Sequence, residues 1–468
     1  MTSRAQIIRL ESSIRRRFRW HLRELGFKRQ GYGSIEPSPG GKEGLRALHR
    51  KARAHALLRE REFISEAYPR LRHNFASGKD VIPSRVRARF ELVGAGTEGS
   101  DLFRLAGLTW GVPVTPGYGR RIRFLVRDES NGKLIGLIGL SDPVFNLTTR
   151  DVAIGWSGED RVHRLVDVMN AHVLGAVPPY NLLLGGKLVA CLVRSKEVRD
   201  VFRARYAESR GLISGERKRA SLVLVTVTSS LGKSSVYDRL RLGDTQYFES
   251  IGFTSGWGHF HVPERLFHDI QKLLRIRHHD YAHGNRFGDG ANWRLRATRE
   301  ALEMLGMDPN LLRHNIRREV FLCRLARNAN QILNGTVSRP DYTGLLTVPE
   351  VCDLAVERWV LRRAQTRPEF QRWKSEYVLR LLDPKDPGLA SLSLARPSMP
   401  AVAASKVRNL EQRRPGPSFV SPFGAAVVPP PIQASVMSHP LLSRPNAGSE
   451  PAPIRRLPRR AFVDDDTG

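Results

Sequence analysis

The chain has 468 residues, which is enough for two or three domains that each bury a hydrophobic core. Its 76 lysines and arginines outnumber 46 aspartates and glutamates, and the net charge of +30 favours polyanionic partners, nucleic acid ahead of phosphorylated cofactors and membrane surfaces. Three widely separated cysteines exclude a disulfide framework, and because no apolar run suits a signal peptide or a membrane span, we expect a cytoplasmic protein with no membrane contact.

Residues 1–78 form a strongly basic region in which we expect two helices, over residues 4–26 and 43–75. The region carries 18 lysines and arginines against 7 acidic residues, and a loop rich in Gly, Pro and Ser separates the two helical patterns. One interpretation is a helical pair that lies on a nucleic-acid backbone, for which the candidate contacts are Arg15, Arg16 and Arg17. The alternative is a solvated helical arm packed on the main domain.

Residues 79–262 are predicted to form an α/β domain that opens on a hairpin. The strings RIRFLVRD and LIGLIGLSD flank a turn at Asn131-Gly132, and such a turn requires a positive φ that these residues tolerate. Arg120 and Arg121 stand at the start of this hairpin and are further candidate contacts for nucleic acid. The remaining elements expected here are a short strand over 151–156, a helix over 160–172, an extended segment over 177–184, a buried strand within 221–230 and a final hairpin within 247–262.

An amphipathic helix is predicted to begin at Gly185-Gly186-Lys187, directly after the extended segment. Paired glycines and a lysine at a helix start bring together backbone N–H groups, the positive end of the helix dipole and a fixed cation. These three residues are therefore a candidate site for an anion or a phosphorylated cofactor. The alternative is that the glycines let the helix pack close to a neighbouring strand, and both interpretations stay open.

Two further motifs invite functional interpretations that their surroundings do not favour. The string LGKSS ends like a nucleotide-binding P-loop, but the pattern requires a glycine where the chain has Val227. We therefore expect a hydroxyl-rich turn capped by Ser234 or Ser235. His279 and His283 are spaced for one face of a helix, yet no further metal ligands cluster with them in the sequence, so we expect no metal site.

Residues 263–380 look mostly helical, with helices expected over 263–277, 298–305, 309–334 and 348–380, the last broken near Arg367-Pro368. The composition changes from 381 to 468, where 15 of the 29 prolines occur. A segment of this kind cannot bury enough apolar surface to order itself, so we expect a disordered Pro- and Arg-rich tail.

The succession of a hairpin, a strand, a glycine-initiated helix, a second strand, a helix and a Gly-Phe hairpin resembles the GNAT N-acyltransferase fold. In that fold a splayed sheet holds acyl-CoA with its pyrophosphate at a glycine-rich helix start, so the resemblance implies acyl-CoA at Gly185, Gly186 and Lys187. The string LLLGGK stands here in place of that family's usual glycine loop. The expected fold class is α/β, with a GNAT-like mixed-sheet core, a basic helical N-terminal arm, a helical C-terminal region and the disordered tail.

A more detailed resemblance covers residues 100–290. The strings GRR-x-RFLVRD, IG-x-x-x-LSDP and RD-x-x-IGW, together with YNLLLGGKL and GFTSGWGHFHV, are similar to the DruA family, named for a component of the bacterial Druantia anti-phage system. The resemblance implies a role in defence against phage or in mobile-element cargo, near nucleic acid and with other defence proteins as partners. It brings no catalytic motif, so whether the chain is an enzyme stays open.

We therefore expect a DruA-like protein that binds nucleic acid through its basic surface. The alternative is a GNAT-like acyltransferase, or another enzyme that uses a phosphorylated cofactor at Gly185–Lys187. A third interpretation is a scaffold whose Pro-rich tail recruits other defence proteins.

Overall fold

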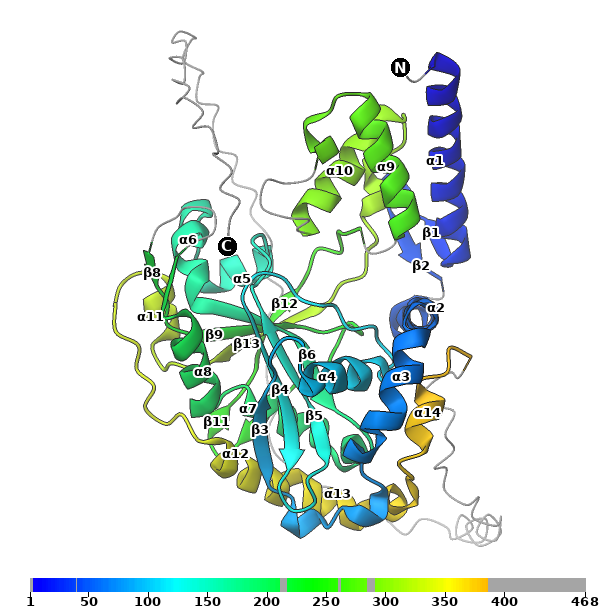
Figure 1. Ribbon diagram of the computed structural model, residues 1–468. Coiled ribbons are helices and arrows are strands. Elements are labelled where there is room, and N and C mark those ends of the chain that lie inside the picture. The colour runs from blue at the N-terminus through cyan, green and yellow to red at the C-terminus, as the bar shows by residue number, and fades with distance from the viewer. Residues whose placement is uncertain (1–2, 39, 211–216, 260–261, 284–290, 386–468) are drawn as a thin grey trace, which may run out of the picture. The chain divides into compact units, whose positions relative to one another are not determined.

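The computed structural model describes residues 3–38, 40–210, 217–259, 262–283 and 291–385. Within them the central element is a seven-stranded mixed sheet in the order β12-β13-β9-β6-β5-β4-β3 (Figure 1). Neighbouring strands are antiparallel except β6 and β9, which run parallel. The predicted mixed α/β class is confirmed. Most of the predicted disordered tail, from residue 386 onward, lies outside the described residues.

The strands are short and mostly apolar. Those of the sheet are, in chain order, β3 (Ala88–Leu92), β4 (Arg121–Asp128), β5 (Leu134–Ser141), β6 (Val168–Ala176), β9 (Leu224–Thr228), β12 (Glu249–Phe253) and β13 (Glu319–Arg324). The other strands of the described residues form antiparallel ribbons of β1 (Phe27–Arg29) with β2 (Ile35–Pro37), β7 (Glu208–Arg210) with β8 (Arg217–Arg219), and β10 (Arg241–Leu242) with β11 (Thr245–Gln246). Every residue of β5 is buried, which explains its unbroken apolar string.

The hairpin predicted from RIRFLVRD and LIGLIGLSD is confirmed as β4 and β5. Gly132 lies in its turn with φ 71°, and its backbone N–H donates to the carbonyl of Asp128 at 2.7 Å. The buried strand predicted within residues 221–230 is also confirmed, as β9. Both elements have a local signal in the sequence: the hairpin has its Asn-Gly turn and β9 has its β-branched residues.

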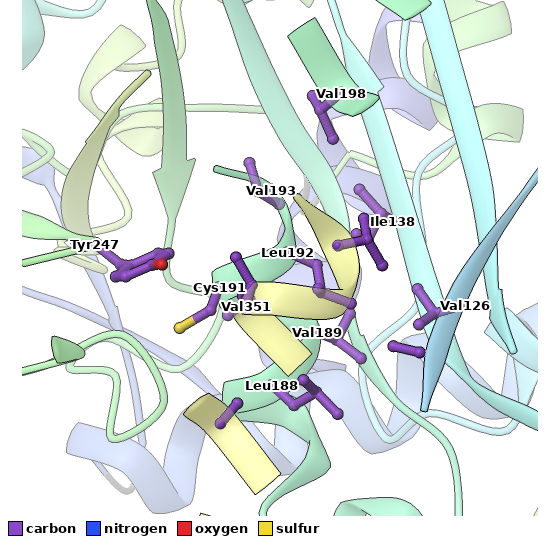
Figure 2. Close-up of a cluster of buried hydrophobic side chains, with 14 of the residues drawn as sticks. Val126, Ile138, Leu188, Val189, Cys191, Leu192, Val193, Val198, Tyr247 and Val351 are labelled. Atoms are coloured by element: carbon purple, nitrogen blue, oxygen red, sulfur yellow. The ribbon is translucent and has the colours of Figure 1, made fainter. Parts of the chain in front are cut away.

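Helices cover both faces of the sheet. One face packs against α7 (Gly185–Leu192), α8 (Lys196–Tyr206) and α12 (Val348–Ala355), and the other against α3 (Arg61–Leu71), α4 (Glu98–Leu108) and α14 (Tyr377–Leu381). Figure 2 shows apolar side chains of α7, among them Leu188 and Val189, close to Val126 and Ile138 of the sheet and Val351 of α12. From α12 the chain continues through a π-helical segment (Val356–Leu361) into α13 (Arg362–Thr366).

Two further clusters surround these layers. The first, which we call the second core, joins α1 (Arg4–Glu24), α9 (Glu264–Ile276) and α10 (Ala291–Met304) with residues of α2 (Gly41–Arg59). The helices predicted over 4–26 and 263–277 are confirmed as α1 and α9. The other cluster contains residues of α5 (Thr148–Ile154) and α11 (Ala329–Leu333), and α6 (Gly158–Arg164) follows α5. No helix in the described part of the chain combines the length and hydropathy that a membrane crossing requires.

Three predictions between residues 151 and 184 are wrong. The expected strand over 151–156 falls on α5 and its end, because the fully buried Arg150 binds the neighbouring Asp151 carboxylate at 2.6 Å and two local carbonyls. The helix expected over 160–172 ends early, since β6 begins at Val168 and pairs with β5. The extended segment expected over 177–184 contains a 3-10 turn at Tyr180–Leu183.

Other helix predictions need changed boundaries. The helix expected over 309–334 is wrong, because β13 lies within it and pairs between β12 and β9. The apolar run of β13 is buried on both faces, and such a run gives no periodic signal that separates a strand from a helix. The helix expected over 43–75 is divided into α2 and α3 at Glu60. The break predicted near Arg367-Pro368 is confirmed by the end of α13 at Thr366.

The packing of α7 predicts different roles for its two first residues. A Cβ at Gly185 would lie 2.6 Å from the carbonyl oxygen of Tyr180, whereas one at Gly186 would meet nothing within 4 Å. We expect Gly185→Ala to lower the free energy of unfolding by roughly 1–3 kcal/mol through this overlap. Gly186→Ala, the matched control, should change it by less than about 1 kcal/mol. Urea unfolding of both variants measures the difference, and equal losses would contradict this account of the packing.

Candidate nucleic-acid interface

Helix α1 is amphipathic, and its apolar face packs against α9 in the second core. Ile14, Phe18 and Leu22 recur every four residues on this face and are all buried. Ser3 and Gln6 cap the N-terminus, each side chain accepting a hydrogen bond from the backbone N–H of the other residue. Burying one such apolar side chain is worth about 1.5–3 kcal/mol, so the apolar face determines which side of α1 faces the solvent.

Polar contacts also hold α1 in place. Arg15 donates from Nε to the carbonyl of Leu305 at 2.8 Å, and Arg17 forms an ion pair with Asp269 of α9. On the same side, Glu11 accepts a hydrogen bond from Arg277 at 2.7 Å. Two of the three arginines predicted as nucleic-acid contacts, Arg15 and Arg17, therefore contact the protein itself.

The opposite side of α1 carries exposed arginines around one exposed tryptophan. We call this the α1 basic face and define it by Arg9, Arg16, Arg19, Trp20 and Arg23. Their spacing of three, four and seven residues places them along one side of the helix. Within the described residues, none of these four arginine side chains has an ion-pair or hydrogen-bond partner.

The α1 basic face is slightly hollowed, and Arg16, Arg19, Trp20 and Arg23 line the shallow groove together with Ser12 and Arg15. Of the residues predicted in this region, Arg16 belongs to the face. Arg9, Arg19, Trp20 and Arg23 were missed, although a helical projection anchored on the apolar stripe would have found them. A row of guanidinium groups that no carboxylate neutralises attracts anions, and each planar fork can bind a phosphate through two hydrogen bonds.

Arg120 and Arg121, the other predicted contacts, lie beside the sheet. Arg120 binds the carboxylate of Asp142 at 2.7 Å and donates to the carbonyls of Val166 and Val168, so it ties the start of β4 to the start of β6. The side chain of Arg121 is exposed. His172 of β6 lies near these arginines. Burial of its ring lowers the pKa to about 4, and the charges of Arg123 and then Arg121 add to this effect. The ring is therefore neutral at physiological pH.

The predicted anion site, Gly185 to Lys187, lies at the start of α7, where Leu184 has a left-handed φ of 61°. The Lys187 ammonium lies 5.6 Å from the ring centre of Trp359, and the Arg358 guanidinium lies 5.9 Å from that same centre. Two cations thus gather around one ring near the helix start. Gly185 is buried against Tyr180, which gives this glycine a packing reason of its own.

The sheet parts beside α7. β6 and β9 pair over Val168–Asn170 and Leu224–Thr226, after which β6 continues only alongside β5. The hydroxyl of Tyr237 lies 3.5 Å from the carbonyl oxygen of Leu174, on the continuing part of β6. Its ring contacts Phe321 of β13 and Phe248, with ring centres 5.5 and 5.2 Å apart. Tyr237 therefore connects the part of β6 beyond its pairing with β9 to β13.

The two weaker motifs have local explanations. The hydroxyl of Ser234 accepts hydrogen bonds from the backbone N–H groups of Val236 and Tyr237, at 3.1 and 3.2 Å, as expected for a serine-capped turn. His279 lies 3.7 Å from Glu300 and accepts a hydrogen bond from the backbone of Tyr281. In the described ranges, no three His, Cys, Asp or Glu side chains gather in a way that could hold a metal ion.

Comparison with known proteins identifies the family. The family model for Druantia protein DruA matches residues 40–335. The Druantia protein DruA of Escherichia coli (strain UMEA 4076-1) is 49% identical over 365 residues, which cover 78% of this chain and 90% of the relative. The chain belongs to the DruA family. Helix α1 precedes the range that the DruA family model matches, whereas the sheet and α7 lie within it. No solved structure matches the chain significantly.

Proposed function

We propose that this DruA-family protein serves a Druantia anti-phage system by binding nucleic acid through the α1 basic face. The observation that carries the proposal is a row of four exposed arginines with no acidic partner among the described residues. Phosphates of a nucleic-acid backbone provide a matching row of negative charges. Other proteins of the same defence system are the partners that family membership suggests.

The type of cation supports nucleic acid over a general attraction to anions. All four charged residues of the face are arginines, whose rigid forks match phosphate geometry better than the point charge of lysine. The face also presents a tryptophan, and aromatic rings among cations are typical of nucleic-acid binding surfaces. The two arginines that dock α1 on the protein fix the orientation of this row, so its charges are already arranged before a partner arrives.

We also propose that the sheet is of the GNAT type and serves this DruA-family protein as a scaffold. Its support is the succession of the β4–β5 hairpin, β6, the glycine-initiated α7 and β9, with the sheet parting after three paired residues. Tyr237 packs between β6, beyond its pairing with β9, and β13. The acyltransferase alternative is supported by the two cations near α7.

Two triple variants that remove the same charge test the interface. Arg16→Ala, Arg19→Ala and Arg23→Ala together should weaken binding to a fluorescein-labelled 30-nucleotide DNA by roughly 10- to 100-fold, because each loses a charge-assisted phosphate contact. The control combines Arg203→Ala, Arg362→Ala and Arg367→Ala, which are exposed arginines on other elements. It should change affinity by less than about 3-fold, since its charge loss lies away from the face. Equal losses in fluorescence anisotropy would contradict the proposal.

Binding of acetyl-CoA tests the acyltransferase alternative. Titration calorimetry of the wild type and of Lys187→Ala with acetyl-CoA should give no binding heat in either case, because Tyr237 packs against β6 beyond its pairing with β9. Heat from the wild type that disappears in Lys187→Ala would overturn this expectation and restore the cofactor site at Gly185–Lys187.

A further inference from the structure

We infer that the α1 basic face binds a single strand of nucleic acid, with an unpaired base stacked on Trp20. The inference rests on the proposed function and adds which form of nucleic acid the face takes. It is carried by the exposure of Trp20, by the cations on either side of its ring, and by a second exposed aromatic that follows α1.

Trp20 is the most exposed of the seven tryptophans, with 60% of its surface accessible. Phe18, two residues earlier in the same helix, is buried in the second core. The two large aromatic rings therefore lie on opposite sides of α1. In the described part of the chain, no aromatic or cationic group lies over the Trp20 ring. Its face is therefore free to receive a planar partner.

The cations around Trp20 suit a strand that passes over the ring. Arg16 lies one turn before it and Arg23 one turn after it, and Arg19 is adjacent. A base stacked on the indole would leave its flanking phosphates within reach of arginines in both directions. The face from Arg9 to Arg23 is about 21 Å long, which corresponds to roughly six nucleotides of one strand.

A second aromatic lies beyond the end of α1. β1 contacts α1 and presents Lys28 and Arg29 to the solvent, and the turn after it carries Tyr32, which is 95% exposed. Tyr32 has φ 56°, a left-handed conformation that costs a non-glycine residue about 1 kcal/mol or more. Between Arg16 and Tyr32 the chain thus presents two exposed aromatics, Trp20 and Tyr32, together with exposed cations, the residue types of a stacking platform.

Duplex DNA would contact the arginines of this surface but would gain little from Trp20. In a duplex the faces of the bases are covered by their neighbours, so a ring on the protein surface gains little from stacking. A single strand offers both bases and phosphates, and stacking a base on an aromatic ring contributes about 1–3 kcal/mol. The tryptophan therefore distinguishes the two forms, whereas the arginines bind the phosphates of either.

The test compares oligo-dT of 20 nucleotides with a 20-base-pair duplex, each fluorescein-labelled, in anisotropy titrations of the full-length protein. Trp20→Ala should weaken oligo-dT binding by roughly 5- to 100-fold and change duplex binding by less than about 2-fold. Trp20→Phe, the matched control, keeps an aromatic ring and should stay within about 3-fold of the wild type on both ligands. Intrinsic tryptophan emission of the wild type should be quenched by oligo-dT, and Trp20→Phe should lose that quenching.

An equal loss on both ligands in Trp20→Ala, or no loss on oligo-dT, overturns the single-strand inference. The triple arginine variant separates this failure from that of the proposed function. If the triple variant binds both ligands as the wild type does, the nucleic-acid interface itself is wrong. If it loses both while Trp20→Ala does not discriminate, the interface stands and the choice of a single strand is wrong.

Discussion

The seven-stranded sheet depends on one short parallel contact. Three residue pairs between β6 and β9 join the half that contains β3, β4, β5 and β6 to the half that contains β9, β13 and β12. So short a pairing requires support from side chains, and α7, α12 and Tyr237 provide it from the core. The side chains of these elements therefore join the two halves of the sheet where the strand pairing is shortest.

The packing of the chain also determines which arginines have partners within the protein. Two arginines near the sheet are neutralised locally, Arg150 by Asp151 and Arg120 by Asp142. On α1, the arginines that face the protein bind Leu305 and Asp269, while those on the other side have no partner among the described residues. The apolar stripe of a single helix therefore determines which positive charges remain available to a polyanion.

The sequence sufficed for elements with a local signal. The Asn131-Gly132 turn predicted its hairpin, and the helical periodicity of residues 4–26 predicted α1. The sequence failed where contacts between distant or buried residues decide the structure. β13 is a strand because it pairs with β12 on one side and with β9 on the other. The helix α5 is stabilised by the buried ion pair of Arg150 with Asp151. Among the site residues, Arg16 was predicted while Trp20 was missed, because a cluster of charges draws attention to composition rather than to the face each residue occupies. Which arginines dock α1 depends on Asp269 of α9 and on Leu305, 252 and 290 residues away along the chain, and no local pattern contains that information.

The most direct test of the account is the salt dependence of binding. The logarithm of the oligo-dT association constant should fall linearly with the logarithm of salt concentration, because bound phosphates release counterions. Removing Arg16, Arg19 and Arg23 should reduce the magnitude of that slope by about 2, at roughly 0.7 for each lost contact on a single strand. A slope that the triple variant leaves unchanged would contradict the assignment of the α1 basic face as the nucleic-acid interface.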